Sequence, residues 1–185
     1  MPTSSPLFLA RSAVVVSAAV LLSGCADATP LAPDLRPAAV AQRAAQPAGE
    51  NATLATLRRA TARYHNLNAA IADGFVFLHG CEVRPDEGPV GSLYVHFGRL
   101  LDGVIDPAAP DGLIYEPGGS HPKLVGVELA VPYPLWTGQA PPALHGTAFQ
   151  REDEFGVFAL HVWIWRDNPE GLFAETNPRV SCGEA

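Results

Sequence analysis

Residues 160–165 alternate strictly between aliphatic and ring-bearing side chains. Because successive side chains of a strand point to opposite faces, this pattern predicts a strand with one aliphatic and one aromatic face. The aliphatic set is Leu160, Val162 and Ile164, and the ring-bearing set is His161, Trp163 and Trp165. The aliphatic face needs a core, and an imidazole flanked by two indoles is costly to leave in water. What covers the ring-bearing face is therefore the functional question.

An amphipathic helix is predicted between Asn51 and Gly74. Its apolar and small positions follow a 3-4-3-4 spacing, which places them on one buried stripe. Asn51 or Thr53 supplies the helix N-cap, and Asp73-Gly74 supplies the left-handed residue that ends the helix. The stripe consists of Leu54, Leu57, Thr61, Tyr64, Asn68, Ile71 and Phe75.

Beyond this helix the pattern becomes β-like, with short apolar or alternating runs separated by Pro/Gly turns. The clearest run is 123–131, where Val and Leu make one face and Glu128 is centred among small residues on the other. The sequence Asn168-Pro169-Glu170 predicts the start of a further short helix. The other predicted strands are 75–78, 93–97, 113–116 and 144–149, and 151–156 is read as a charged hairpin.

The 18 Pro and 17 Gly among 185 residues favour many short elements joined by turns over a helical bundle. The predicted fold is α+β, with one N-terminal amphipathic helix packed on a mostly antiparallel, curved sheet. The alternative is a small β-barrel or sandwich with an appended helix. Residues 51–185 form the one predicted globular domain. The net charge of −7, with no basic patch, excludes nucleic acid as a partner.

The first residues resemble a targeting signal. Arg11 precedes the apolar run 13–22, which is too short to span a bilayer. Leu22-Ser23-Gly24-Cys25 resembles the lipobox of bacterial lipoproteins, and this implies that 1–24 are removed and that Cys25 is acylated. The membrane is then a partner through the lipid on Cys25, on the extracytoplasmic side, and 25–50 form an Ala/Pro-rich tether. The alternative is an ordinary secretory signal with an incidental cysteine.

Besides the acylated Cys25, the chain has two cysteines, Cys81 and Cys182. An exported chain with two remaining cysteines predicts a disulfide that closes a loop of about 100 residues. The competing interpretation is a pair of thiolate metal ligands.

Three polar residues share one property on the predicted strands. His96, Glu128 and His161 each lie on the face opposite an aliphatic face, so we expect them on one common side of the sheet. Two imidazoles and a carboxylate suit a divalent transition metal such as zinc, copper, nickel or iron. Glu116 is a candidate fourth ligand or an acceptor for an imidazole N–H. The predicted walls of this site are Tyr94, Trp163 and Trp165.

The sequence leaves other interpretations open. No two of these residues have the close spacing of a metal-binding motif such as His-x-His. In the structural alternative, Glu128 pairs with Arg99 or Arg166 and no ligand is bound. The same residues also permit acid/base catalysis, with Glu128 or Glu116 opposite His161.

Several motifs over residues 51–182 resemble those of a family of exported bacterial proteins of uncharacterised activity. Members typically carry Met-Gly where this chain has Leu93-Tyr94, and the resemblance implies a common fold. The motifs are Leu101-Asp102-Gly103, Asp106-Pro107, Tyr115-Glu116-Pro117, Leu124-Val125-Gly126-Val127-Glu128, and His161-Val162-Trp163 with Asn168-Pro169, Asn177-Pro178 and Cys182.

Three functions follow from these expectations. The first is a lipid-anchored module in the cell envelope that binds a small ligand or a metal. The second is a structural or protein-interaction lipoprotein that docks a partner through its Trp-bearing face. The third is a metal-assisted or acid/base hydrolase.

Overall fold

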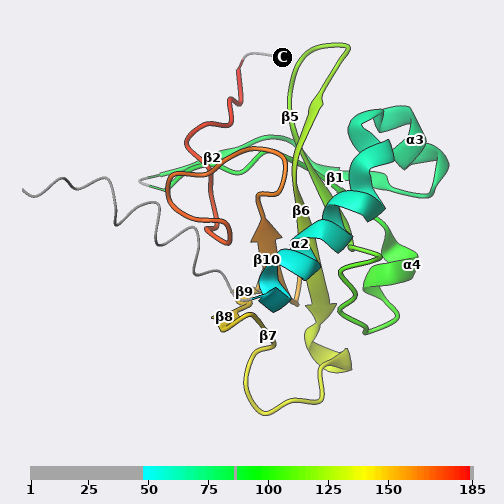
Figure 1. Ribbon diagram of the computed structural model, residues 1–185, viewed down its shortest axis with the longest axis vertical. Helices are drawn as coiled ribbons and strands as arrows, with labels where there is room; N and C mark the ends of the chain where they lie inside the picture. Colours follow the sequence, from blue (N-terminus) through cyan, green and yellow to red (C-terminus); the bar gives the residue numbers. More distant parts are fainter. Residues whose placement is uncertain (1–47, 86, 184–185) are drawn as a thin grey trace, which may run out of the picture. The chain divides into compact units, whose positions relative to one another are not determined.

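Six strands form one sheet in which every neighbouring pair is antiparallel (Figure 1). The order is β1-β4-β5-β6-β10-β9, so the sheet is open with β1 and β9 at its edges. The computed structural model describes residues 48–85 and 87–183, and the predicted signal, Cys25 and most of the tether lie outside them. The α+β prediction is confirmed, and the barrel alternative is wrong. The strands are β1 (Val76–His79), β4 (Ser92–Val95), β5 (Gly112–Glu116), β6 (Lys123–Pro132), β9 (Gln150–Glu152) and β10 (Val157–Val162).

The predicted single helix is broken in two. Helix α2 spans Ala48–Thr61, a 3-10 turn η1 spans Ala62–His65, and α3 spans Leu67–Ala72. Asn66 is extended, and its side chain accepts a hydrogen bond from the backbone N–H of Asn68, which starts α3 anew. Gly74 ends α3 with φ +100°, as predicted.

The break shifts the phase of the buried stripe, because a 3-10 turn has fewer residues per turn than an α-helix. Leu54, Leu57 and Tyr64 are buried as predicted, but Ile71 is 51% exposed and Ala70 takes its place inside. The prediction of one unbroken helix up to Asp73-Gly74 is therefore wrong.

Both faces of the sheet carry apolar side chains. Helix α2 crosses one face, where Leu54 and Leu57 pack on side chains of β5, β6 and β10 (Figure 1). The opposite face has a second cluster of buried residues, Leu93, Val95, Ile114, Val125, Trp163 and Val180. The expected common side of the sheet is wrong for His96, because on β4 the aliphatic residues Leu93 and Val95 face away from the helix.

Strand β10 ends sooner than predicted, at Val162. The backbone N–H groups of Trp165 and Arg166 both donate to the carbonyl oxygen of Val125, so the chain bends at this point. Trp165 therefore leaves the predicted alternation. No helix follows among the described residues 163–183, and turns replace the short helix predicted after Asn168.

Smaller elements complete the described chain. A disulfide joins Cys81 and Cys182, with their Cα atoms 5.3 Å apart, which confirms the predicted bond and excludes free thiolate ligands. No helix in the described part of the chain is long and apolar enough to cross a membrane. The remaining elements are the strand pairs β2 (Val83–Arg84) with β3 (Gly88–Pro89) and β7 (Ala143–Leu144) with β8 (Thr147–Ala148), and the short helices α4 (Phe97–Leu100) and η2 (Tyr133–Leu135).

Candidate functional site

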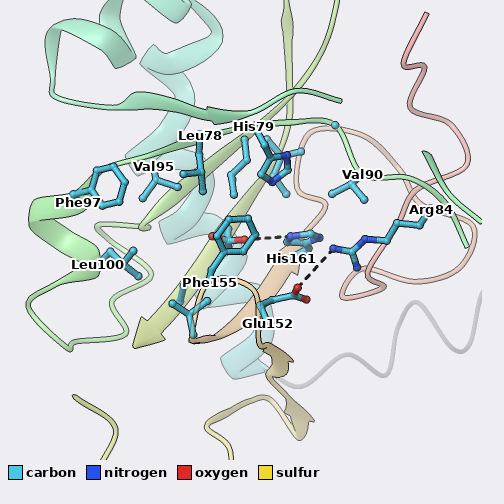
Figure 2. Close-up of a pocket in the computed structure, with 16 residues that line it drawn as sticks. Leu78, His79, Arg84, Val90, Val95, Phe97, Leu100, Glu152, Phe155 and His161 are labelled. Carbon is cyan, nitrogen blue, oxygen red and sulfur yellow. Dashed lines mark hydrogen bonds and ion pairs between the residues drawn. The ribbon is translucent and has the colours of Figure 1, made fainter. Parts of the chain in front are cut away.

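A pocket of about 120 Å³ lies on the sheet face opposite helix α2 (Figure 2). Its floor comes from β4, β5, β6 and β10, and its sides come from the segments before β4 and between β9 and β10. Two predicted site residues, Glu128 and His161, line it. The apolar lining consists of Leu78, Val90, Leu93, Val95, Phe97, Leu100, Ile114, Ala130, Phe155 and Val157.

Strand register brings Glu128 and His161 together. The two residues are direct partners across β6 and β10, and Nε2 of His161 lies 3.3 Å from Oε2 of Glu128. On its other side Glu128 is paired with Gly112 of β5. A Cβ at position 112 would lie 2.8 Å from Cβ of Glu128 and 3.2 Å from its Oε1. A glycine is therefore needed there for the carboxylate to occupy its place.

Both ring nitrogens of His161 are engaged. Nδ1 lies 2.7 Å from the carbonyl oxygen of Glu175, which can only accept, so Nδ1 carries a proton. Burial lowers the pKa of His161, but the hydrogen bond to Glu128 and the charges of Glu175 and Glu128 outweigh it and raise the pKa to about 9. At neutral pH the pair is an imidazolium beside a carboxylate, and both N–H groups donate to protein oxygens.

Arg84 supplies the second cation at the pocket. Its Nη1 donates to Oε1 of Glu175 at 2.7 Å, and its other nitrogens lie 3.5 Å from Glu82 and 3.8 Å from Glu152. Burial opposes the charge on Arg84, but the charges of Glu175 and Glu152 raise its pKa. Figure 2 shows His161, Arg84 and Glu152 along the same side of the pocket.

The pocket has more acceptor oxygens than donors. Oε1 of Glu128 receives no hydrogen bond from the described residues, although Glu128 is only 8% exposed. Within the same described part, the side chain of Glu152 contacts Arg84 through one long ion pair and accepts no hydrogen bond. Burial and the charge of Glu175 raise the pKa of Glu152, which reflects this shortage of donors.

Another buried carboxylate, that of Asp111, is bonded to the backbone of the pocket residue Ala130. Asp111 is 1% exposed, its Oδ2 accepts from the backbone N–H of Ala130 at 2.8 Å, and its Oδ1 has no partner within the described chain. Burial raises the pKa of Asp111 to about 7, with a contribution from the charge of Glu128. A buried carboxyl without a second donor favours its neutral form.

The predicted companions His96 and Tyr94 lie elsewhere. His96 follows β4 and caps α4, where its Nδ1 accepts from the backbone N–H of Arg99. Its ring packs edge-on against Phe75 on the helix side of the sheet. The ring of Tyr94 packs on Tyr115 on that same side. Neither residue lines the pocket, because β4 has the opposite face orientation from the one predicted.

Both predicted tryptophans have structural positions. Nε1 of Trp165 donates to Oγ1 of Thr61 on helix α2, on the wrong side of the sheet for the pocket. Trp163 is 3% exposed, and its Nε1 donates to the carbonyl oxygen of Ala174. Its ring lies edge-on to His161 with centroids 6.0 Å apart, so it packs beside His161 without lining the pocket.

Glu116 holds the end of the chain in place. One oxygen accepts from Arg166 at 2.7 Å and lies 3.6 Å from Lys123, and the other accepts from the backbone N–H of Ser181. The predicted metal set of His96, Glu116, Glu128 and His161 does not come together. Among the described residues no group of three or more His, Cys, Asp or Glu side chains is placed to hold a metal ion.

Sequence reasoning missed Arg84, Glu152 and Glu175. For Glu152 a signal existed, because a hairpin from 150 to 159 pairs Glu152 with Val157 and so places it on the face of His161. Arg84 and Glu175 lie in irregular segments on either side of the disulfide, where no periodicity indicates direction.

Comparisons with protein-family models, curated proteins and solved structures gave no match.

Proposed function

We propose that this chain is a lipid-anchored, extracytoplasmic binding domain whose pocket takes up a small, mostly apolar molecule. The observation that carries the proposal is an apolar pocket with a buried, charged pair in its floor. Such a combination is typical of ligand sites, where apolar walls supply affinity and a few polar groups fix orientation. The volume of about 120 Å³ suits a group near the size of a benzene ring, which an engineered 150 Å³ cavity accepts.

Two features support the location. The lipobox-like sequence ending at Cys25 implies acylation, and the disulfide between Cys81 and Cys182 is typical of an oxidising compartment. The anchor would keep the binding domain at the membrane surface.

Binding is favoured over catalysis by the state of His161. A general base needs a free nitrogen within reach of substrate, and both nitrogens of His161 donate to protein oxygens. No Ser, Thr or Cys lies among the residues that line the pocket. Docking of a protein through the Trp-bearing face is disfavoured because Trp163 is buried.

The test uses the full chain carrying Cys25→Ser, which cannot be acylated and so removes lipid from the binding measurement. We expect toluene to bind with a dissociation constant of about 0.1 to 1 mM, measured by calorimetry and by amide NMR shifts around the pocket. Ala130→Leu fills part of the pocket and should weaken binding at least about tenfold. The matched control is Ala143→Leu on the exposed strand β7, which should bind like the parent. Equal binding to both variants would refute the proposal.

A further inference from the structure

We propose that the ligand of this pocket is a hydrophobic amine, whose ammonium group meets Glu128 and Glu152 while its apolar body fills the rest. This inference rests on the proposed function and names the class of ligand. It follows from the hydrogen-bond and ion-pair partners of the polar groups at the pocket.

The two cations of this network, His161 and Arg84, already have acidic partners. His161 donates one N–H to Glu128 and the other to the carbonyl oxygen of Glu175. Each side-chain nitrogen of Arg84 faces a different acid, Glu175, Glu82 or Glu152. An anionic ligand would have to displace one of these carboxylates, and no donor of His161 is left for it.

The carboxylates are in excess. Four acids in this network, Glu82, Glu128, Glu152 and Glu175, face the two cations Arg84 and His161. Two negative charges therefore have no cation of their own. The carboxylate oxygens that receive no hydrogen bond from the described chain belong to residues that line the pocket. They are Oε1 of Glu128 and both oxygens of Glu152, whose Oε2 lies 3.8 Å from Arg84 in an ion pair.

Position and burial make Glu128 the stronger of the two recognition groups. It sits in the centre of the sheet and is 8% exposed, so a charge-assisted hydrogen bond there forms in a low-dielectric setting. Glu152 has a side chain 22% exposed at the pocket edge, where an ammonium group can reach it from solvent.

The walls match the rest of such a ligand. Leu78, Val95 and Leu100 offer aliphatic contact, and the rings of Phe97 and Phe155 stand at the pocket with 44% and 45% of their surface exposed. Figure 2 shows Phe97, Val95 and Leu100 on one side, His161 and Arg84 on the other, and the ring of Phe155 between them. Aromatic rings also favour a nearby ammonium group through their quadrupole.

The experiment compares three probes that share one ring, benzylamine, benzyl alcohol and phenylacetate, binding to the full chain with Cys25→Ser. We expect benzylamine to bind about tenfold more tightly than benzyl alcohol, and phenylacetate to bind most weakly. Glu152→Gln should weaken benzylamine about fivefold and change benzyl alcohol less than about twofold. The matched control is Glu154→Gln, an exposed acid on the same hairpin that is outside this network.

Equal affinity for benzylamine and benzyl alcohol would overturn the inference and leave the proposed function standing. Tightest binding of phenylacetate would overturn it as well, because the cations would then be the recognition groups. If none of the probes binds, the proposed function itself fails. An equal effect of the two glutamine variants would also count against Glu152 as a recognition group.

Discussion

The ion pair of His161 and Glu128 should make the stability of the protein depend on pH above neutrality. Folding raises the pKa of His161 from 6.5 to about 9, so the folded chain holds a proton that the unfolded chain releases. The contribution is fully present below pH 6.5 and is lost as pH rises through about 9. The difference between these values corresponds to about 3 kcal/mol of the free energy of unfolding. Since His161 is 6% exposed, solvent screening reduces this little.

The assay is urea unfolding of the full chain carrying Cys25→Ser, followed by far-UV circular dichroism at half-unit steps from pH 6 to pH 10. The parent should lose about 3 kcal/mol over this range, and His161→Gln should lose far less while being less stable at pH 6. The control is His121→Gln, an exposed histidine in the loop before β6, which should keep the slope of the parent.

A flat stability profile of the parent between pH 6.5 and pH 9 would refute this reasoning. So would an NMR titration that places the midpoint of the His161 ring below pH 7. Glu128→Gln gives a second check, because removal of the partner carboxylate should shift the midpoint down even where His161→Gln folds poorly.

Two further perturbations test other parts of the structure. Folding raises the pKa of Asp111 from 3.8 to about 7, so the free energy of unfolding should fall by about 4 kcal/mol as pH rises from 4 to 7. Urea unfolding of Asp111→Asn should show no such fall. A parent whose free energy of unfolding is constant over this range would contradict the account. Joint replacement of Cys81 and Cys182 by Ser should lower the free energy of unfolding by about 4 to 5 kcal/mol, because the disulfide closes a loop with a sequence separation of 101. A loss below about 1 kcal/mol in the same assay would show that the disulfide is not a main constraint on the unfolded chain.

The pairing of Glu128 with His161 was within reach of the sequence, because both lie on regular strands opposite unbroken aliphatic faces. Their two strands are neighbours in the sheet, so equal face orientation was enough to bring them together. The disulfide and the α+β class followed from equally general constraints, namely the predicted export and the order of the predicted elements.

The rest depended on information that a strand pattern lacks. Alternation shows which residues share a face of β4 but not which face meets the helix, and Leu93 and Val95 packed on a second apolar cluster. Trp165 left its predicted face because the chain bends after Val162 to satisfy backbone N–H groups. Arg84 lies in an irregular segment whose position is set by tertiary contacts.

Glu128 also bears on how the sheet assembles. It is opposite Gly112 on one neighbouring strand and His161 on the other, so one carboxylate belongs to two strand alignments. A shift of β6 by one residue would turn this carboxylate toward helix α2, among Leu113 and Leu160. An unpaired charge in that core costs several kcal/mol, so misaligned sheets are disfavoured before they can persist. The residue proposed to recognise a ligand in the finished domain thus also selects the correct strand alignment while the chain folds.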